Sequence, residues 1–181
     1  MIIGITGSFG AGKGAVVDYL IKKKGFAYFS ARAFIAEEVA RQGLPVDRDT
    51  LASVANELRA EHGPTYLIQS LLQEAETSGK DSVIEALRAV AEAKCIQEEG
   101  GIVLGVDASP EIRYERAIQR ASETDHVTFE KWLEQEKNEM NPGDPTKQDI
   151  FGALAISDVI IQNDGTLEEL HQKVDAFLEG F

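Results

Sequence analysis

Short apolar runs rich in β-branched residues alternate along this chain with stretches in which apolar residues recur every three or four positions. Runs of the first kind are typical of buried strands, and stretches of the second kind predict amphipathic helices. The expected strands cover residues 1–6, 26–30, 82–85, 102–107 and 158–162. The expected helices cover residues 15–21, 31–42, 50–61, 65–77, 88–99, 110–120 and 129–140, and another follows residue 166.

This alternation of strands and helices predicts one α/β domain with a five-stranded parallel sheet and helices on both faces. The helix over residues 31–42 is followed before the third strand by two further helices, over residues 50–61 and 65–77, which indicate an inserted helical lobe over about residues 31–79. The polar stretch over about residues 122–147 is a second, smaller insertion. The core of the domain then consists of residues 1–30, 80–121 and 148–181.

Local signals set several helix ends. Gly25 follows the first helix and predicts a C-cap, because glycine adopts a left-handed conformation without strain. Asp49 or Thr50 is the expected N-cap of the helix that follows. Thr166 and Glu169 have the Thr-x-x-Glu spacing of a capping box, which predicts the start of the closing helix.

The first expected strand leads directly into a glycine-rich loop that ends in Gly-Lys and opens a helix. Its glycines allow backbone N–H groups to curl around an anion, the helix adds its positive end, and the lysine supplies a mobile charge. The alternative is a plain turn with an exposed lysine, but the flanking strand and helix are the context of a phosphate-binding P-loop. We therefore expect a nucleoside triphosphate to bind at Gly7, Ser8, Phe9, Gly10, Ala11, Gly12, Lys13, Gly14 and Ala15.

The residues after Lys13 depart from the usual P-loop pattern. A serine or threonine normally follows the lysine and places its hydroxyl on Mg²⁺. Here Gly14 and Ala15 follow, and neither has a side-chain oxygen. A metal ion would then depend on phosphate oxygens, water and a carboxylate from another part of the chain.

Composition narrows the possible partners. The 181 residues include 18 basic and 31 acidic ones, which gives a formal net charge of −13. This charge argues against bulk nucleic acid or an anionic membrane as a partner. Cys95 is the single cysteine, so no disulfide forms within the chain. With an expected strand that begins at the first residue and no apolar run of membrane-spanning length, we expect a reduced, cytoplasmic protein.

With these residues in view, the chain resembles P-loop kinases of the nucleoside-monophosphate-kinase type, including adenylate kinases and dephospho-CoA kinases. It is also similar to a group of archaeal adenylate-kinase-like proteins. The resemblance implies that the helical lobe binds a phosphoryl acceptor and that residues 122–147 form a lid. It also implies ATP as the phosphoryl donor, Mg²⁺ as the metal and a small phosphorylated acceptor as the partner.

The end of the third strand carries part of this resemblance. Adenylate kinases have Asp-Gly-x-x-Arg there, and this chain has Glu85-Ala86-Leu87-Arg88. The resemblance implies that Glu85 holds Mg²⁺ and that Arg88 contacts the acceptor's phosphate. The alternative is a solvated carboxylate at a strand end and a surface arginine at a helix start.

Arg116 and Arg120 lie four residues apart, so they share one helix face. Kinases of this type place two such arginines at the base of the lid, where they contact adenine and the transferring phosphoryl group. The alternative is that both pair with glutamates of their own helix. The resemblance further implies that a loop after the last strand contacts adenine, here formed by Asn163, Asp164 and Gly165.

Ser30 and Arg32 follow the second strand, where the related kinases begin their acceptor site, and Arg59 could reach it from the helical lobe. Dephospho-CoA kinases have Asp-x-Asp at this point, whereas this chain has Ser30-Ala31-Arg32. In addition, no arginine follows Arg120, although adenylate-kinase lids supply arginines.

Three hypotheses follow. The first is an ATP-dependent kinase of nucleoside or deoxynucleoside monophosphates, with Lys13, Arg88 and Arg120 as catalytic residues. The second is a dephospho-CoA kinase, and the third is an ATP-binding regulatory module that transfers nothing. Ala15 and the lid without arginines keep the third hypothesis open.

Overall fold

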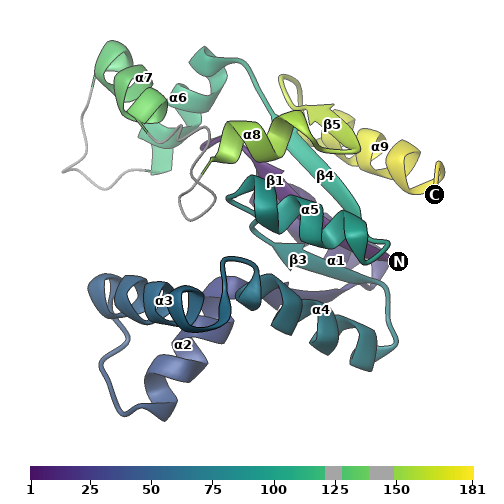
Figure 1. Ribbon diagram of the computed structural model, residues 1–181. Coiled ribbons are helices and arrows are strands. Elements are labelled where there is room, and N and C mark those ends of the chain that lie inside the picture. The colour runs from purple at the N-terminus through teal and green to yellow at the C-terminus, as the bar shows by residue number, and fades with distance from the viewer. Residues whose placement is uncertain (121–127, 139–148) are drawn as a thin grey trace.

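The computed structural model describes residues 1–120, 128–138 and 149–181. Its centre is a five-stranded sheet in the order β2-β3-β1-β4-β5, with every neighbouring pair parallel (Figure 1). The strands are β1 (Ile2–Gly7), β2 (Ala27–Ser30), β3 (Ser82–Glu85), β4 (Ile102–Asp107) and β5 (Val159–Gln162). The five predicted strands and their parallel arrangement are confirmed.

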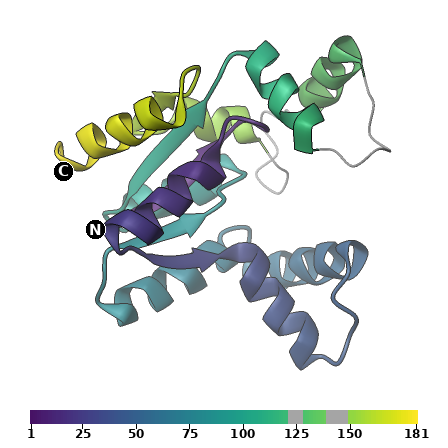
Figure 2. The same ribbon diagram turned by 180° about the vertical axis from the view of Figure 1, so that it is seen from behind.

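Helices cover both faces of this sheet. The helices that precede β3 are α1 (Lys13–Lys24), α2 (Ala31–Arg41), α3 (Arg48–His62) and α4 (Tyr66–Ser78). Those that follow it are α5 (Val90–Glu98), α6 (Pro110–Arg120), α7 (Phe129–Asn138), α8 (Ile150–Ala155) and α9 (Leu167–Leu178). Helices α1 and α9 pack on one face, whereas α4, α5 and α8 pack on the other (Figures 1 and 2).

Three groups of buried side chains hold these layers together. The first joins the sheet to α1 and α9 and contains Ile3, Ile5 and Leu20, all fully buried. The second joins the opposite face to α4, α5 and α8. The third lies within the helical lobe and packs α2, α3 and Leu67 of α4 around Val39. Helix α4 therefore belongs to the lobe through Leu67 and to the sheet through its other buried residues.

The helix-end signals explain where most helices start and stop. Gly25 has φ 78° and its N–H donates to the carbonyl of Ile21, and Thr166 and Glu169 form the predicted capping box. The predicted cap of α3 was wrong. Asp47 is the N-cap, because its extended backbone lets its carboxylate accept the N–H of Thr50 at 2.8 Å.

Two other features differ from the prediction. Helix α5 begins at Val90 instead of residue 88, because Ala89 is extended and the N–H of Arg88 donates to the carboxylate of Glu92. The short helix α8 was not predicted. Its N-cap is Asp149, whose side chain accepts the N–H of Gly152 at 2.9 Å. In the described part of the chain, no helix has the length and apolar composition needed to span a bilayer.

Candidate functional site

All five strands run in the same direction, so their carboxyl ends meet at one edge of the sheet. In parallel α/β sheets this edge is where ligands bind. Strand β1 ends at Gly7 and continues as the glycine-rich loop, β3 ends at Glu85 and β4 ends at Asp107. Strand β2 ends at Ser30, and Asn163 is the first residue after β5. The topology thus gathers the P-loop and most other predicted site residues at one edge.

Two neighbouring segments, α6 at Arg113 and the loop after β5 at Asn163, lie against the P-loop. Gly10 and Gly12 have φ values of 81° and 97°, which favour glycine. A Cβ at Gly10 would lie 2.5 Å from the backbone oxygen of Arg113, and one at Gly12 would collide with the side-chain amide of Asn163. The loop conformation therefore requires glycine at both positions, for backbone geometry and for space.

Lys13 is the first residue of α1, and its side chain lies over the loop. Its Nζ donates to the carbonyls of Gly7 at 2.7 Å and Ser8 at 2.9 Å. The residue is half-buried, at the point where the N-terminus of α1 adds its positive end. A glycine cradle, a helix N-terminus and a lysine are the groups that bind the phosphates of a nucleotide.

The hydroxyls of Ser8 and Thr6 form hydrogen bonds within the protein. The Ser8 hydroxyl is buried and donates to Oδ1 of Asp107, which also accepts the N–H of Ala108 at 2.9 Å. The Thr6 hydroxyl donates to the carbonyl of Leu87 at 3.0 Å. Because Gly14 and Ala15 follow Lys13, the P-loop has no serine or threonine hydroxyl at or next to the usual metal-binding position.

A cavity of about 420 Å³ adjoins the end of the P-loop. Its lining includes Gly12, Ala15, Arg116, Gln119, Asn163, Gly165, Leu167 and Leu170. Nδ2 of Asn163 donates to the carbonyl of Ala11 at 2.8 Å, and Nη1 of Arg116 approaches the same oxygen at 3.5 Å. The structure thus brings together Arg116, Asn163 and Gly165, which were predicted to contact adenine.

Asp164 lies beside this cavity and faces the start of α6. Its carboxylate accepts the N–H of Ser109 at 2.7 Å and a hydrogen bond from Gln162 at 2.9 Å. These two bonds hold the pKa of the exposed Asp164 carboxyl below its usual value. Asp164 therefore ties the loop after β5 to α6, while its neighbour Asn163 contacts the P-loop.

Glu85 ends β3, which pairs with β1 on one side, and it is in register with Ser30 of β2 on the other. The Tyr28 hydroxyl donates to Oε2 of Glu85 at 2.7 Å, and partial burial together with this bond raises the pKa of Tyr28. Within the described residues, no three His, Cys, Asp or Glu side chains are grouped in a way that could hold a metal ion. A metal at this edge would therefore need ligands from phosphates and water in addition to any from the protein.

The other predicted acceptor residues lie on the side of β2 and β3. Ser30 caps α2 by accepting the N–H of Ala33 at 3.4 Å, whereas the side chains of Arg32 and Arg88 are exposed. Arg59 of α3 lies 3.7 Å from Glu92 of α5. Thus one arginine of the helical lobe and the loop that carries Arg88 are joined through the same glutamate.

Glu92 was not singled out from the sequence. It is 5% exposed, and its Oε2 accepts the N–H of Arg88 at 2.7 Å. Burial raises its pKa, although the bond from Arg88 and the charge of Arg59 act in the opposite direction. In the sequence it is one of several glutamates on an amphipathic helix, and only its burial distinguishes it.

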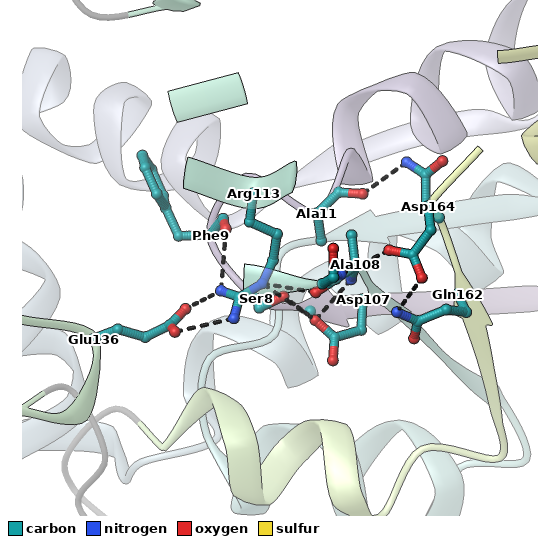
Figure 3. A network of polar contacts seen from close by, with 12 residues as sticks. Ser8, Phe9, Ala11, Asp107, Ala108, Arg113, Glu136, Gln162 and Asp164 are labelled. Carbon is teal, nitrogen blue, oxygen red and sulfur yellow. Dashed lines mark hydrogen bonds and ion pairs between the residues drawn. The ribbon is translucent and has the colours of Figure 1, made fainter. Parts of the chain in front are cut away.

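Arg113 was also missed. Its side chain is 4% exposed and lies between the P-loop, the end of β4 and α7 (Figure 3). It donates to the carbonyls of Ala108 at 2.9 Å and Phe9 at 3.5 Å, and it forms a two-bond ion pair with Glu136. Arg120, which was predicted to be catalytic, is the last residue of α6, and its side chain lies outside the described residues. Of the lid predicted over residues 122–147, only residues 128–138 are described.

The parallel sheet and the glycine-rich loop that ends in Lys13 define the class of protein, an α/β domain with a P-loop. Residues 3–141 match the family described as "AAA domain". The chain is 31% identical to a "UPF0200 protein" of Pyrococcus abyssi, over 98% of this chain and 95% of the relative. It therefore belongs to the AAA domain family and to the UPF0200 proteins.

Solved structures share the whole architecture at low sequence identity. The protein TT1252 from Thermus thermophilus superposes with a TM-score of 0.65 at 22% identity, over 100% of this chain and 97% of that one. Dephospho-CoA kinase from Campylobacter jejuni superposes with a TM-score of 0.61 at 16% identity, over 98% and 95%. At these identities the likeness establishes a P-loop kinase fold.

Proposed function

We propose that this chain is an ATP-dependent phosphotransferase whose acceptor is a nucleoside or deoxynucleoside monophosphate. The observation that carries the proposal is the juxtaposition of two parts at one sheet edge. One is a P-loop with Lys13 folded over it, and the other is a helical lobe whose Arg59 approaches the loop of Arg88. The first part suits the triphosphate of a donor, and the second suits an anionic acceptor.

The P-loop and the adjacent cavity fit a nucleoside triphosphate. The backbone at Gly10 and Gly12 forms a narrow cradle that a Cβ would fill, as phosphate-binding loops require. Lys13 would turn from the loop carbonyls to the outer phosphates. Arg116 and Asn163 line the neighbouring cavity, where the nucleoside would lie. Arg120, at the end of the same helix as Arg116, would neutralise charge on the transferring phosphoryl group.

Mg²⁺ would neutralise charge on the phosphates when bound. Among the residues of this chain, Glu85 is the carboxylate that would orient its water ligands, and Tyr28 fixes the direction of that carboxylate. Because Ala15 offers no oxygen, we expect the metal to depend more on phosphate oxygens than it does in P-loops with a serine or threonine.

Acceptor selection would fall to the opposite side of the site. Arg88 and Arg59 supply the positive charge for the acceptor's own phosphate, and Ser30 and Arg32 lie at the mouth of the lobe. A phosphorylated acceptor suits this set, because guanidinium groups bind phosphate through paired hydrogen bonds. The net charge of −13 makes such a local positive region favourable only for small anions.

The experiment is an acceptor panel. Purified protein is incubated with Mg²⁺ and ATP, and ADP formation is measured with each nucleoside monophosphate, each deoxynucleoside monophosphate and dephospho-CoA. We expect acceptor-dependent ADP formation with one or a few monophosphates. Turnover with dephospho-CoA alone would replace this proposal with the second kinase activity. ATP binding without any acceptor-dependent ADP would favour the regulatory module.

A further inference from the structure

Arg113 places a buried positive charge directly behind the P-loop. Its guanidinium contacts three separate segments, namely the loop at Phe9, the end of β4 at Ala108 and helix α7 at Glu136 (Figure 3). A charge this deeply buried requires a paired counter-charge. Among the described residues, the carboxylates within ion-pair distance are those of Glu136 and of Asp107, the latter at 3.7 Å.

These two carboxylates do not contribute equally. Asp107 already accepts the Ser8 hydroxyl and the N–H of Ala108 through the oxygen that is nearer to Arg113. Glu136 instead meets the guanidinium with both of its oxygens, and its own side chain is 12% exposed. A bidentate carboxylate fixes the plane of a guanidinium as well as its charge. Glu136 is therefore the group that orients Arg113.

Aromatic packing fixes the helix that carries Glu136. Trp132 is 7% exposed, with its ring centroid 5.1 Å from the Arg113 guanidinium carbon. Phe129 and Trp132 of α7 also pack edge-on against Tyr114 of α6, at 5.3 and 6.0 Å between ring centroids. Helix α7 and the P-loop thus share one buried arginine, although they are separated by more than a hundred residues in sequence.

We propose that Arg113 is a positioning residue of the P-loop and that it couples nucleotide binding to helix α7 through Glu136. The inference rests on the proposed binding of ATP, but it goes beyond it by assigning a role to α6 and α7. Phosphates in the P-loop attract the guanidinium behind Phe9, and its movement alters the Glu136 pair and the environment of Trp132. By linkage, the pairing with Glu136 changes the affinity for the phosphates by the same factor.

The single tryptophan of the chain makes this coupling measurable. Trp132 emission is recorded while ATP is added, and ATP binding is measured separately by equilibrium dialysis with labelled nucleotide. We expect ATP to change the emission and adenosine, which lacks phosphates, to leave it unchanged. Trp132→Phe serves as the control that the signal comes from this residue.

Variants test the role of the pair. We expect Arg113→Lys to weaken ATP binding about tenfold, and Glu136→Gln to weaken it several-fold while reducing the emission change. Glu134→Gln is the matched control, because it removes the same charge from an exposed position on the same helix. Circular dichroism and thermal unfolding establish that each variant is folded, and Glu136→Gln carries the test if Arg113→Lys does not fold.

The outcomes separate this inference from the proposed function. An ATP affinity of Glu136→Gln equal to or above that of Glu134→Gln overturns the coupling, as does an emission that stays constant while wild type binds ATP. Failure of the wild type to bind ATP in dialysis overturns the coupling together with the proposed kinase activity. Weaker binding in both pair variants, with an emission change that depends on phosphates, supports it.

Discussion

On the side of β1, β4 and β5, the candidate site is lined by buried polar groups that are hydrogen bonded within the protein, whereas on the side of β2 and β3 its arginines are exposed or half-buried. Ser8, Asn163 and Arg113 are buried on the first side. Arg32 and Arg88 are exposed on the second, and Arg59 is held by an ion pair with a separation of 3.7 Å. Donors that are already held in place suit a ligand that always binds in the same way, because they need no rearrangement when it binds.

The helical lobe carries two of these arginines, Arg32 on α2 and Arg59 on α3. Its α2 and α3 pack around Val39 together with Leu67 of α4, and Ala31 and Phe34 of α2 also pack against the second buried group, which holds the sheet. Arg59 and Glu92 form one link between α3 and the main body. The lobe is thus joined to the sheet by apolar packing as well as by this ion pair.

The largest effect is expected on the side of β1, β4 and β5, from Lys13→Ala. Loss of the ammonium group should reduce turnover by about 10³-fold and weaken ATP binding, because phosphoryl transfer depends mainly on positioning and charge neutralisation. The fold should persist, since Lys13 contacts the loop through its ammonium and is only half-buried. Steady-state ADP formation measures the effect, with Lys23→Ala on the same helix as control. Undiminished turnover in folded Lys13→Ala protein would remove the P-loop from the mechanism.

A second prediction contrasts the two sides directly. Arg120→Ala should chiefly lower kcat, by as much as about 10³-fold, if that arginine meets the phosphoryl group in flight. Arg88→Ala should chiefly raise the KM of the acceptor, because the acceptor's phosphate is bound alike in the ground and transition states. Initial rates over a grid of ATP and acceptor concentrations separate the two effects. Normal turnover in Arg120→Ala would give α6 a structural role beyond Arg113 and Arg116.

A third prediction concerns the space around two glycines of the P-loop, Gly12 and Gly14. Gly12→Ala should lower the free energy of unfolding by about 2 kcal/mol, because it forces a side chain into a left-handed conformation and against Asn163. Gly14→Ala should instead raise it by up to about 1 kcal/mol, since a Cβ there meets nothing within 4 Å and alanine favours the helix. Urea denaturation of both variants measures these changes. Equal stabilities would mean that Asn163 does not press on the loop.

The smallest effect is expected at the link between lobe and body. Because burial raises the pKa of Glu92, the unfolded chain releases this proton at lower pH than the folded chain does. The unfolding free energy of the wild type should therefore fall as pH rises above the ordinary glutamate value. Glu92→Gln removes this dependence, so the stability of this variant relative to that of the wild type should increase as the pH rises above the ordinary glutamate pKa.

Urea denaturation at several pH values measures this difference. Glu98→Gln, which changes an exposed glutamate on the same helix, is the matched control and should leave the pH dependence of the wild type unchanged. A stability difference between wild type and Glu92→Gln that is constant with pH would show that Glu92 titrates alike in both states.

Local chain geometry governs the parts of this protein that its amino-acid sequence predicts. The five strands, the Gly25 and Thr166 helix ends and the P-loop all rest on residues that lie within a few positions of one another. Their conformations follow from backbone freedom at glycine, local hydrogen bonds and the period of apolar residues. For the same reason, the sequence pattern is sufficient to identify Lys13 and the loop glycines.

Strand order and the polar contacts between distant segments depend instead on the tertiary structure. Ser8 and Asp107 are 99 residues apart in sequence, and Arg113 meets Phe9 across 104 positions. Nothing in the local sequence distinguishes Arg113 from other helix arginines or Glu92 from other helix glutamates. Their roles arise because burial removes water from a charge, and the fold then supplies a partner from a distant part of the chain.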